Sequence, residues 1–177
     1  MAAKVEAGGS KKARVAAVIA AAVILIAIAV IIGINMFGSQ RTPKSTLEGY
    51  FNALYCETMI KHMTPYLVDD IQQICYDDFT FYGQSVGILR AYQEEKAEIV
   101  GPDFTLSVRI DNEETGSSAA LSSAAKSYGA SALMDVSFTV TFEGEQDTAD
   151  FTGIARLVKV SGKWYLTEYN LPLERVE

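Results

Sequence analysis

Few residues in this chain combine the types and the spacing that catalysis or metal binding needs. The chain has one histidine, His62, and two cysteines, which excludes multi-histidine sites and zinc sites with four cysteine or histidine ligands. His62 falls at the end of an expected helix, where a cation or a polar cap is favourable. No partner residue lies at motif spacing from it. We therefore predict that His62 caps a helix, and that the chain has no catalytic residue, metal ligand or cofactor site.

Two acidic pairs, Asp69-Asp70 and Asp77-Asp78, stand at the two ends of a second expected helix. Calcium prefers carboxylate ligands, but a calcium-binding loop places them in the pattern D-x-D-x-D-G. That pattern is absent from the sequence. We therefore predict that these four carboxylates form a solvated acidic rim.

The two cysteines, Cys56 and Cys75, fall at similar heights on two expected antiparallel helices. If the chain turns near Thr64, Cys56 lies eight residues before the turn and Cys75 lies eleven residues after it. At about 1.5 Å per residue, these separations are roughly 12 Å and 17 Å. Both residues also lie on apolar helix faces that could meet. A disulfide in an exported domain and a pair of buried free thiols are equally compatible with this placement.

Local signals predict the helices that carry these residues. Thr42-Pro43 places a capping residue before a proline at the first helical position, and Ser45 with Glu48 adds a capping-box pattern. The same start recurs at Thr64-Pro65, and apolar residues then follow with helical spacing. The expected helices span about residues 43–62, 64–75 and 84–98.

Beyond residue 103 the hydrophobic period changes to two, which is typical of half-buried strands. The alternation is clearest from Met134 to Phe142, where every second residue is apolar. Ser161-Gly162 is a signal for a tight hairpin. Short connections predict an antiparallel meander, and helices on one face of such a sheet make an α+β domain. The expected strands span residues 104–111, 134–143, 148–160 and 163–170, with a short helix over residues 117–128.

Charge divides the sequence into three parts. Residues 1–14 carry four Lys or Arg and one Glu, residues 15–40 carry no charge, and residues 41–177 carry 11 Lys or Arg and 21 Asp or Glu. The net charge of −7 argues against a nucleic-acid partner, because phosphate contacts need clustered cations. Within the uncharged part, residues 15–34 contain nothing more polar than glycine. As a helix this run spans about 30 Å, which matches the hydrocarbon core of a bilayer.

An uncleaved signal anchor explains this apolar run better than a signal peptide does. The run exceeds the usual length of about 7–15 residues, and no small-x-small cleavage site follows it. Four cations precede the run and only Arg41 and Lys44 follow closely, so the N-terminus is expected in the cytoplasm. We predict a single-pass protein of the cell membrane. Its parts are a cytoplasmic tail (1–14), a transmembrane helix (15–38), a tether (39–44) and an extracytoplasmic domain (45–177).

The order of helix, helix, helix, strand, helix and three meandering strands resembles the nuclear transport factor 2-like superfamily, which has a cone-shaped, cystatin-like α+β fold. Residues 42–67, TPKSTLEGYFNALYCETMIKHMTPYL, are similar to the opening of small bacterial membrane-anchored members. Residues 154–166, IARLVKVSGKWYL, resemble their closing hairpin. The resemblance implies three to four helices packed on a curved four-stranded antiparallel sheet. Such members are commonly found in Gram-positive cell envelopes without an assigned activity.

The resemblance also implies where a ligand would enter. In cone folds, residues that follow the second helix can line the mouth of the cavity. The aromatic residues at this place are Tyr76, Phe79, Phe81 and Tyr82. In the other interpretation, Phe79 and Phe81 only close the core beneath a loop.

A non-enzymatic role fits the resemblance best. Isomerases of this superfamily pair a tyrosine with buried carboxyls inside the cone, whereas the inward strand positions here are apolar. We expect a binding module of the bacterial cell envelope, whose partner is a small apolar ligand or an envelope protein. The alternative is an oligomerising subunit of a secretion or conjugation assembly, and less favoured is an enzyme of the isomerase or dehydratase type. The sequence leaves the oligomeric state open.

Overall fold

The computed structural model describes residues 41–57, 59–80 and 85–177. The tail and the transmembrane helix expected over residues 1–38 lie outside these ranges, as do the first two residues of the expected tether. Within the described ranges, no helix combines the length and the apolar character that crossing a membrane requires.

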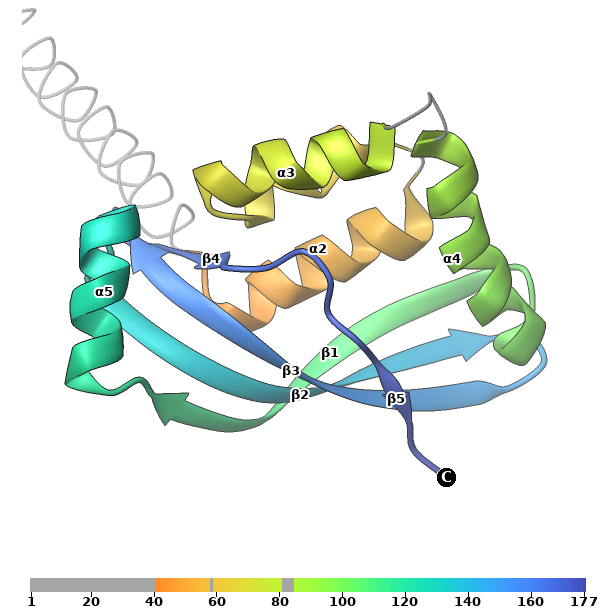
Figure 1. Ribbon diagram of the computed structural model, residues 1–177. Helices are drawn as coiled ribbons and strands as arrows, with labels where there is room; N and C mark the ends of the chain where they lie inside the picture. The colour runs from red at the N-terminus through yellow and green to blue at the C-terminus, as the bar shows by residue number, and fades with distance from the viewer. Residues whose placement is uncertain (1–40, 58, 81–84) are drawn as a thin grey trace, which may run out of the picture. The chain divides into compact units, whose positions relative to one another are not determined.

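Helices α2, α3 and α4 lie on one side of an antiparallel sheet (Figure 1). The strand order is β1-β2-β3-β4. The short strand β5 pairs with the same edge of β3 as β4 does, farther along the strand. This arrangement confirms the predicted α+β class and the antiparallel meander. The helices are α2 (Pro43–Cys56), η1 (Ile60–His62), η2 (Thr64–Tyr66), α3 (Asp69–Thr80), α4 (Ser85–Val100) and α5 (Ser118–Tyr128). The strands are β1 (Phe104–Thr115), β2 (Ala132–Gly144), β3 (Thr148–Val160), β4 (Lys163–Leu166) and β5 (Glu174–Arg175).

The start of α2 follows the local signals. The Thr42 hydroxyl accepts a hydrogen bond from the Ser45 amide at 3.1 Å, and the Ser45 hydroxyl accepts one from the Thr42 amide at 2.9 Å. The capping box is therefore Thr42 with Ser45, and not Ser45 with Glu48 as predicted. The predicted helix start at Pro43 is confirmed, and Pro43 and Lys44, which the predicted tether also included, lie in the first turn of α2.

The prediction that the first helix runs to His62 is wrong, because α2 ends at Cys56. Glu57 has extended backbone angles (φ −111°, ψ 162°), and its backbone carbonyl accepts a hydrogen bond from the side-chain Nε2 of Gln93 in α4 at 2.7 Å. The chain then returns to the core through η1 and η2, which bury Ile60 and Met63. A contact with a distant helix therefore replaces the last helical turns.

The expected second helix begins later than its proline signal. Thr64–Tyr66 form only a 3-10 turn, and Leu67 is extended (φ −99°, ψ 155°) and pairs with Leu166. The Val68 amide donates to the Leu166 carbonyl at 3.0 Å. The backbone of residues 67 and 68 is thus paired with the edge of the sheet, and α3 begins only at Asp69.

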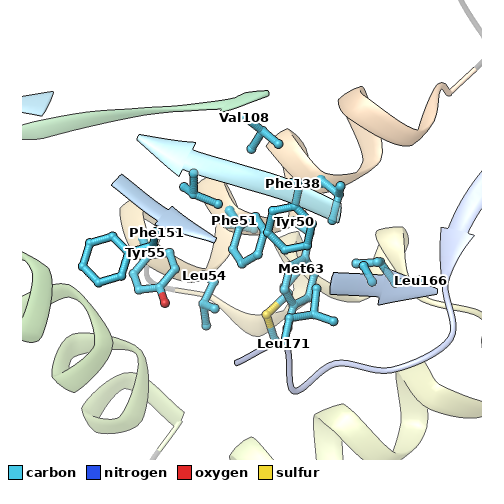
Figure 2. Packing of buried hydrophobic residues seen from close by; sticks show 14 of the residues in the cluster. Tyr50, Phe51, Leu54, Tyr55, Met63, Val108, Phe138, Phe151, Leu166 and Leu171 are labelled. Carbon is cyan, nitrogen blue, oxygen red and sulfur yellow. The ribbon is translucent and has the colours of Figure 1, made fainter. Parts of the chain in front are cut away.

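The sheet presents its apolar face to α2. Val136, Phe138, Val140 and Phe142 of β2 are fully buried, as the alternation predicted. Figure 2 shows Phe138 packed beside Phe51 and Tyr50 of α2, and the Phe51 and Phe138 ring centroids are 5.4 Å apart. On the opposite face, α5 covers a smaller apolar cluster around Leu133 and Val158.

The hairpin between β3 and β4 confirms its sequence signal. Ser161 and Gly162 both have positive φ angles, 50° and 83°, as a two-residue hairpin turn requires. The last strand is shorter than predicted, because β4 ends at Leu166 and not at Asn170. The chain then crosses toward β5, burying Leu171 on the way (Figure 1).

Candidate functional site

Hydrogen bonds connect α2, α3 and the segment after β4. The Tyr50 hydroxyl donates to the Tyr169 backbone carbonyl, and the Tyr169 hydroxyl donates to the Asp78 carboxylate. Burial raises the pKa of Tyr50 well above its usual value, and the hydrogen bond to Asp78 raises the pKa of Tyr169 to about 12. Both phenols are therefore protonated at neutral pH, and their hydrogens hold three segments of the fold together.

A buried ammonium group lies on the sheet side of α4. Lys96 is 3% exposed, and its Nζ lies 4.3 Å from the centroid of the Phe151 ring. The same Nζ is 2.6 Å from Oε1 of Glu95, whose side chain is largely exposed. The aromatic face and the carboxylate together compensate the loss of water around the charge.

The apolar face of the sheet leaves no room for a ligand beneath α2. Tyr50, Phe51, Phe138 and Phe142 have no accessible surface, whereas a cavity able to hold water would expose the residues that line it. In the described part of the chain, every fully buried side-chain nitrogen or oxygen has a hydrogen-bond partner. The fully buried polar side-chain groups of the described residues are thus used by the fold itself.

A large groove opens instead on the surface, between α4, the end of α2 and the start of β1. It has a volume of about 820 Å³. We call it the α4–β1 groove. Its walls come from four segments that are distant in sequence, namely the end of α2, one face of α4, the start of β1 and the β2–β3 turn. The residues used below are Tyr55, Cys56, Arg90, Glu94, Asp103, Phe104, Thr105, Glu143 and Glu145.

Close backbone contact between α4 and the β2–β3 turn shapes this groove. The Gln146 amide donates to the Val100 carbonyl at 3.0 Å. A Cβ atom at Gly144 would lie 2.1 Å from that same carbonyl oxygen, so only glycine permits this approach. Glu143 and Glu145, on either side of Gly144, are thereby held at one wall of the groove.

The groove is acidic. Glu94, Asp103, Glu143 and Glu145 are exposed carboxylates on its walls, and Arg90 is the one cation among its lining residues. Within the described ranges, none of these five side chains forms an ion pair of 4 Å or less or a side-chain hydrogen bond. The carboxylates are therefore available to a partner.

A phenol lies at the floor of the groove. Tyr55 is 5% exposed, and its ring packs edge-to-face on Phe142, with centroids 5.0 Å apart. Its hydroxyl has no hydrogen-bond partner among the described residues, yet it is not fully enclosed. Figure 2 shows this hydroxyl turned away from the Phe51 ring. Tyr55 lines the groove, and we take the small accessible part of its hydroxyl to face the groove.

The predicted cavity-mouth residues do not share one environment. Tyr76 lies on α3 and is 49% exposed, whereas Phe79 is buried in the core, with ring centroids 6.4 Å from Tyr92 and 6.2 Å from Tyr169. Phe81 and Tyr82 lie outside the described residues. The cavity-mouth interpretation therefore stays a prediction.

Both cysteines carry free thiols in the structure. Cys56 is exposed at the end of α2 and lines the groove, whereas Cys75 is buried in the core. Burial, followed by the nearby Asp78 carboxylate, raises the pKa of Cys75 to about 12. Burial, followed by Glu57, also raises the pKa of Cys56.

His62 closes η1 instead of the first helix, and its Nδ1 lies 3.1 Å from Oε2 of Glu57. The acidic pairs stand at the two ends of α3, as expected. Asp78 accepts the Tyr169 hydrogen bond and Asp77 accepts one from Gln73 at 2.7 Å. Over the described ranges, no three His, Cys, Asp or Glu side chains are grouped as metal ligands would be.

No protein-family profile matches the sequence, and no curated protein matches it either. The groove residues were not singled out from the sequence. The Glu-Gly-Glu turn at residues 143–145 and the Gly-Pro-Asp stretch at residues 101–103 are visible acidic turns. Only the pairing of β1 with β2 brings them together, through the register Phe104 opposite Gly144.

Proposed function

We propose that this protein is a single-pass, membrane-anchored binding module of the bacterial cell envelope, and that its binding site is the α4–β1 groove. The uncharged run over residues 15–34 and the four cations before it support an anchor with a cytoplasmic N-terminus. The acidic domain would then lie outside the cytoplasm. An envelope protein is the proposed partner.

We also propose that the domain has the cone-shaped fold of the nuclear transport factor 2-like superfamily. The observed order of α2, α3, α4, β1, α5, β2, β3 and β4 is the order that carried the resemblance. The curled antiparallel sheet with α2 across its apolar face supports the same assignment (Figure 1).

One contrast carries the functional proposal. The space beneath the helices is filled, whereas the α4–β1 groove is large, lies open to solvent and is lined by unpaired polar groups. A site enclosed by the sheet would suit a small apolar ligand or an isomerase substrate. A surface groove suits a segment of another protein, because such a segment enters from solvent and contacts several walls at once.

Site-specific photo-crosslinking in cells tests the proposal. A benzophenone amino acid replaces Thr105, an exposed groove residue of β1, in the full-length protein. The matched control places it at Ser122, an exposed residue of α5 that does not line the groove. We expect a crosslink to a different envelope protein from position 105 and none from position 122.

The other outcomes contradict the proposal in distinct ways. Crosslinks only between copies of this chain would favour the oligomerising subunit of an assembly. Equal crosslinking from both positions would show contact without use of the groove. Absence of any crosslink from position 105, at normal expression and with the chain in the membrane, would contradict binding at the groove.

A further inference from the structure

We infer that the α4–β1 groove binds a basic polypeptide segment, with a lysine or arginine side chain of that segment placed over the Tyr55 hydroxyl. This inference rests on the proposed function and assigns the chemistry of its partner. Three features carry it, namely the charge of the walls, the phenol at the floor and the shape of the groove.

The walls favour a cation. Glu94 lies on α4, Asp103 precedes β1, and Glu143 lies at the end of β2 with Glu145 close behind it. None of these carboxylates lies within 4 Å of a cation of the described residues. Four carboxylates against the single lining cation Arg90 leave the groove negative, and a further cation between the carboxylates relieves their mutual repulsion.

The floor offers a hydrogen-bond partner that the protein does not use. The Tyr55 side chain is 5% exposed, but its hydroxyl has no partner in the described part of the chain and borders the groove. Burial, with Glu95 and Tyr92 as further causes, raises the pKa of this phenol, which therefore stays protonated. Its oxygen can accept an N–H from a guanidinium or an ammonium group. An acidic rim alone would not define a site, but the hydroxyl of a largely buried tyrosine beneath the rim, without a partner among the described residues, does.

The dimensions favour a polypeptide over a metal ion or a small amine. About 820 Å³ is far more space than one cation fills, and the described residues contain no group of metal ligands. Phe104 is half-buried in the groove wall, so it offers apolar surface to the methylene stem of a lysine or an arginine. The open side allows the chain to run through the groove.

Fluorescence anisotropy tests the inference. The probe is a dye-labelled decapeptide of alternating lysine and serine, titrated with the full-length protein in detergent. The comparison peptide replaces every lysine with glutamate. We expect binding of the lysine peptide only, and we expect its affinity to fall about tenfold between roughly 50 and 300 mM salt, because screening weakens exposed charge pairs.

Two sets of variants locate the binding. The double change Glu143→Gln with Glu145→Gln should weaken binding about fivefold, as the loss of two exposed charge pairs predicts. Its matched control is Glu113→Gln with Glu114→Gln, which removes the same charge from β1 outside the groove and should leave the affinity within about twofold. Tyr55→Phe removes only the hydroxyl and should weaken binding about threefold to tenfold.

Several results would overturn the inference. Equal weakening by both double variants would show attraction by net charge alone, and unchanged affinity of Tyr55→Phe would remove the phenol from the site. Spermine that binds tighter than the peptide, with the same dependence on Glu143 and Glu145, would identify a small amine as the ligand. If the lysine peptide fails to bind while the crosslink from position 105 forms, the proposed function stands and this partner chemistry is wrong.

Discussion

The side chain of Tyr169 connects the segment after β4 to α3 through one hydrogen bond to Asp78. We expect Tyr169→Phe to lower the free energy of unfolding by about 1 kcal/mol, the usual effect of one lost hydrogen bond. In thermal unfolding of the full-length protein, this corresponds to about 2–4 °C. The fluorescence of Trp164, the only tryptophan, reports the transition.

The same substitution predicts a pH dependence. The pKa of Tyr169 is about 12 in the folded protein and about 10 in an unfolded chain. Because the folded state holds this proton more tightly, its contribution is complete below about pH 10 and declines as the pH rises from about 10 toward 12. The difference in melting temperature between wild type and Tyr169→Phe should therefore be constant from about pH 7 to 9 and shrink above about pH 10. A constant difference up to about pH 11.5 would contradict the assignment.

Neutral substitutions of Lys96 and of its partner Glu95 are predicted to have different effects on stability. Lys96→Met fills the same space without an ammonium group, so we expect a stability within about 1 kcal/mol of wild type. Glu95→Gln leaves the ammonium without its counter-charge and should destabilise by about 1–2 kcal/mol, less than for a fully buried pair because Glu95 is exposed. The control is Glu94→Gln, because Glu94 is next to Glu95 in the sequence but forms no ion pair among the described residues. This change should have little effect on stability. The melting temperatures of the three variants show whether Glu95→Gln is the least stable, as predicted.

Two glycines on neighbouring elements should respond oppositely to alanine. At Gly144 a Cβ would meet the Val100 carbonyl oxygen at 2.1 Å, so α4 and the β2–β3 turn must separate, which costs about 1–3 kcal/mol. At Gly87 in α4 a Cβ would meet no atom within 4 Å, and alanine should stabilise the helix by about 0.5–1 kcal/mol. Gly144→Ala should also weaken binding of the lysine peptide. Equal melting temperatures for the two variants would disprove the predicted packing.

Elements with local causes were predictable, and elements decided by distant contacts were not. The apolar alternation of β2, the Thr42 cap and the Ser161-Gly162 turn each depend on a few neighbouring residues. The end of α2 depends on Gln93, which lies 36 residues beyond Glu57. The start of α3 depends on Leu166, which takes the Val68 amide into the sheet edge.

The groove depends on such distant contacts throughout. Tyr55, Asp103 and Glu143 share it only because α2 lies on the sheet and β1 pairs with β2. Taken singly, Tyr55 has the pattern of a core residue and the carboxylates have the pattern of solvated turns. The sequence could therefore indicate the acidic character of the domain, but not the place where the charge surrounds an unpaired phenol.

Thiol labelling can test the orientation of the chain in the membrane. Cys56 is exposed and can react, whereas Cys75 is buried. If residues 41–177 lie outside the cell, a membrane-impermeant maleimide should label intact cells once per chain. Cys56→Ser should abolish that labelling, and Cys75 should react only after denaturation. Labelling should be faster at about pH 8.5 than at about pH 7, because burial and Glu57 raise the pKa of Cys56 and the thiolate is the reactive form.

The change Ala3→Cys, made in the Cys56→Ser variant, distinguishes the orientations. With the N-terminus in the cytoplasm, the introduced thiol reacts only after lysis. Its labelling in intact cells would reverse the proposed topology and place the groove in the cytoplasm, where an envelope partner could not reach it.

The same labelling separates the two cysteine alternatives that the spacing leaves open. Wild-type chains that become labelled in intact cells only after a reductant is added would carry the disulfide between Cys56 and Cys75. That bond would draw the end of α2 toward α3 and away from its exposed position beside the groove. Peptide affinity should then differ between reduced and oxidised protein, whereas equal affinity in both states, with labelling that needs no reductant, fits two free thiols.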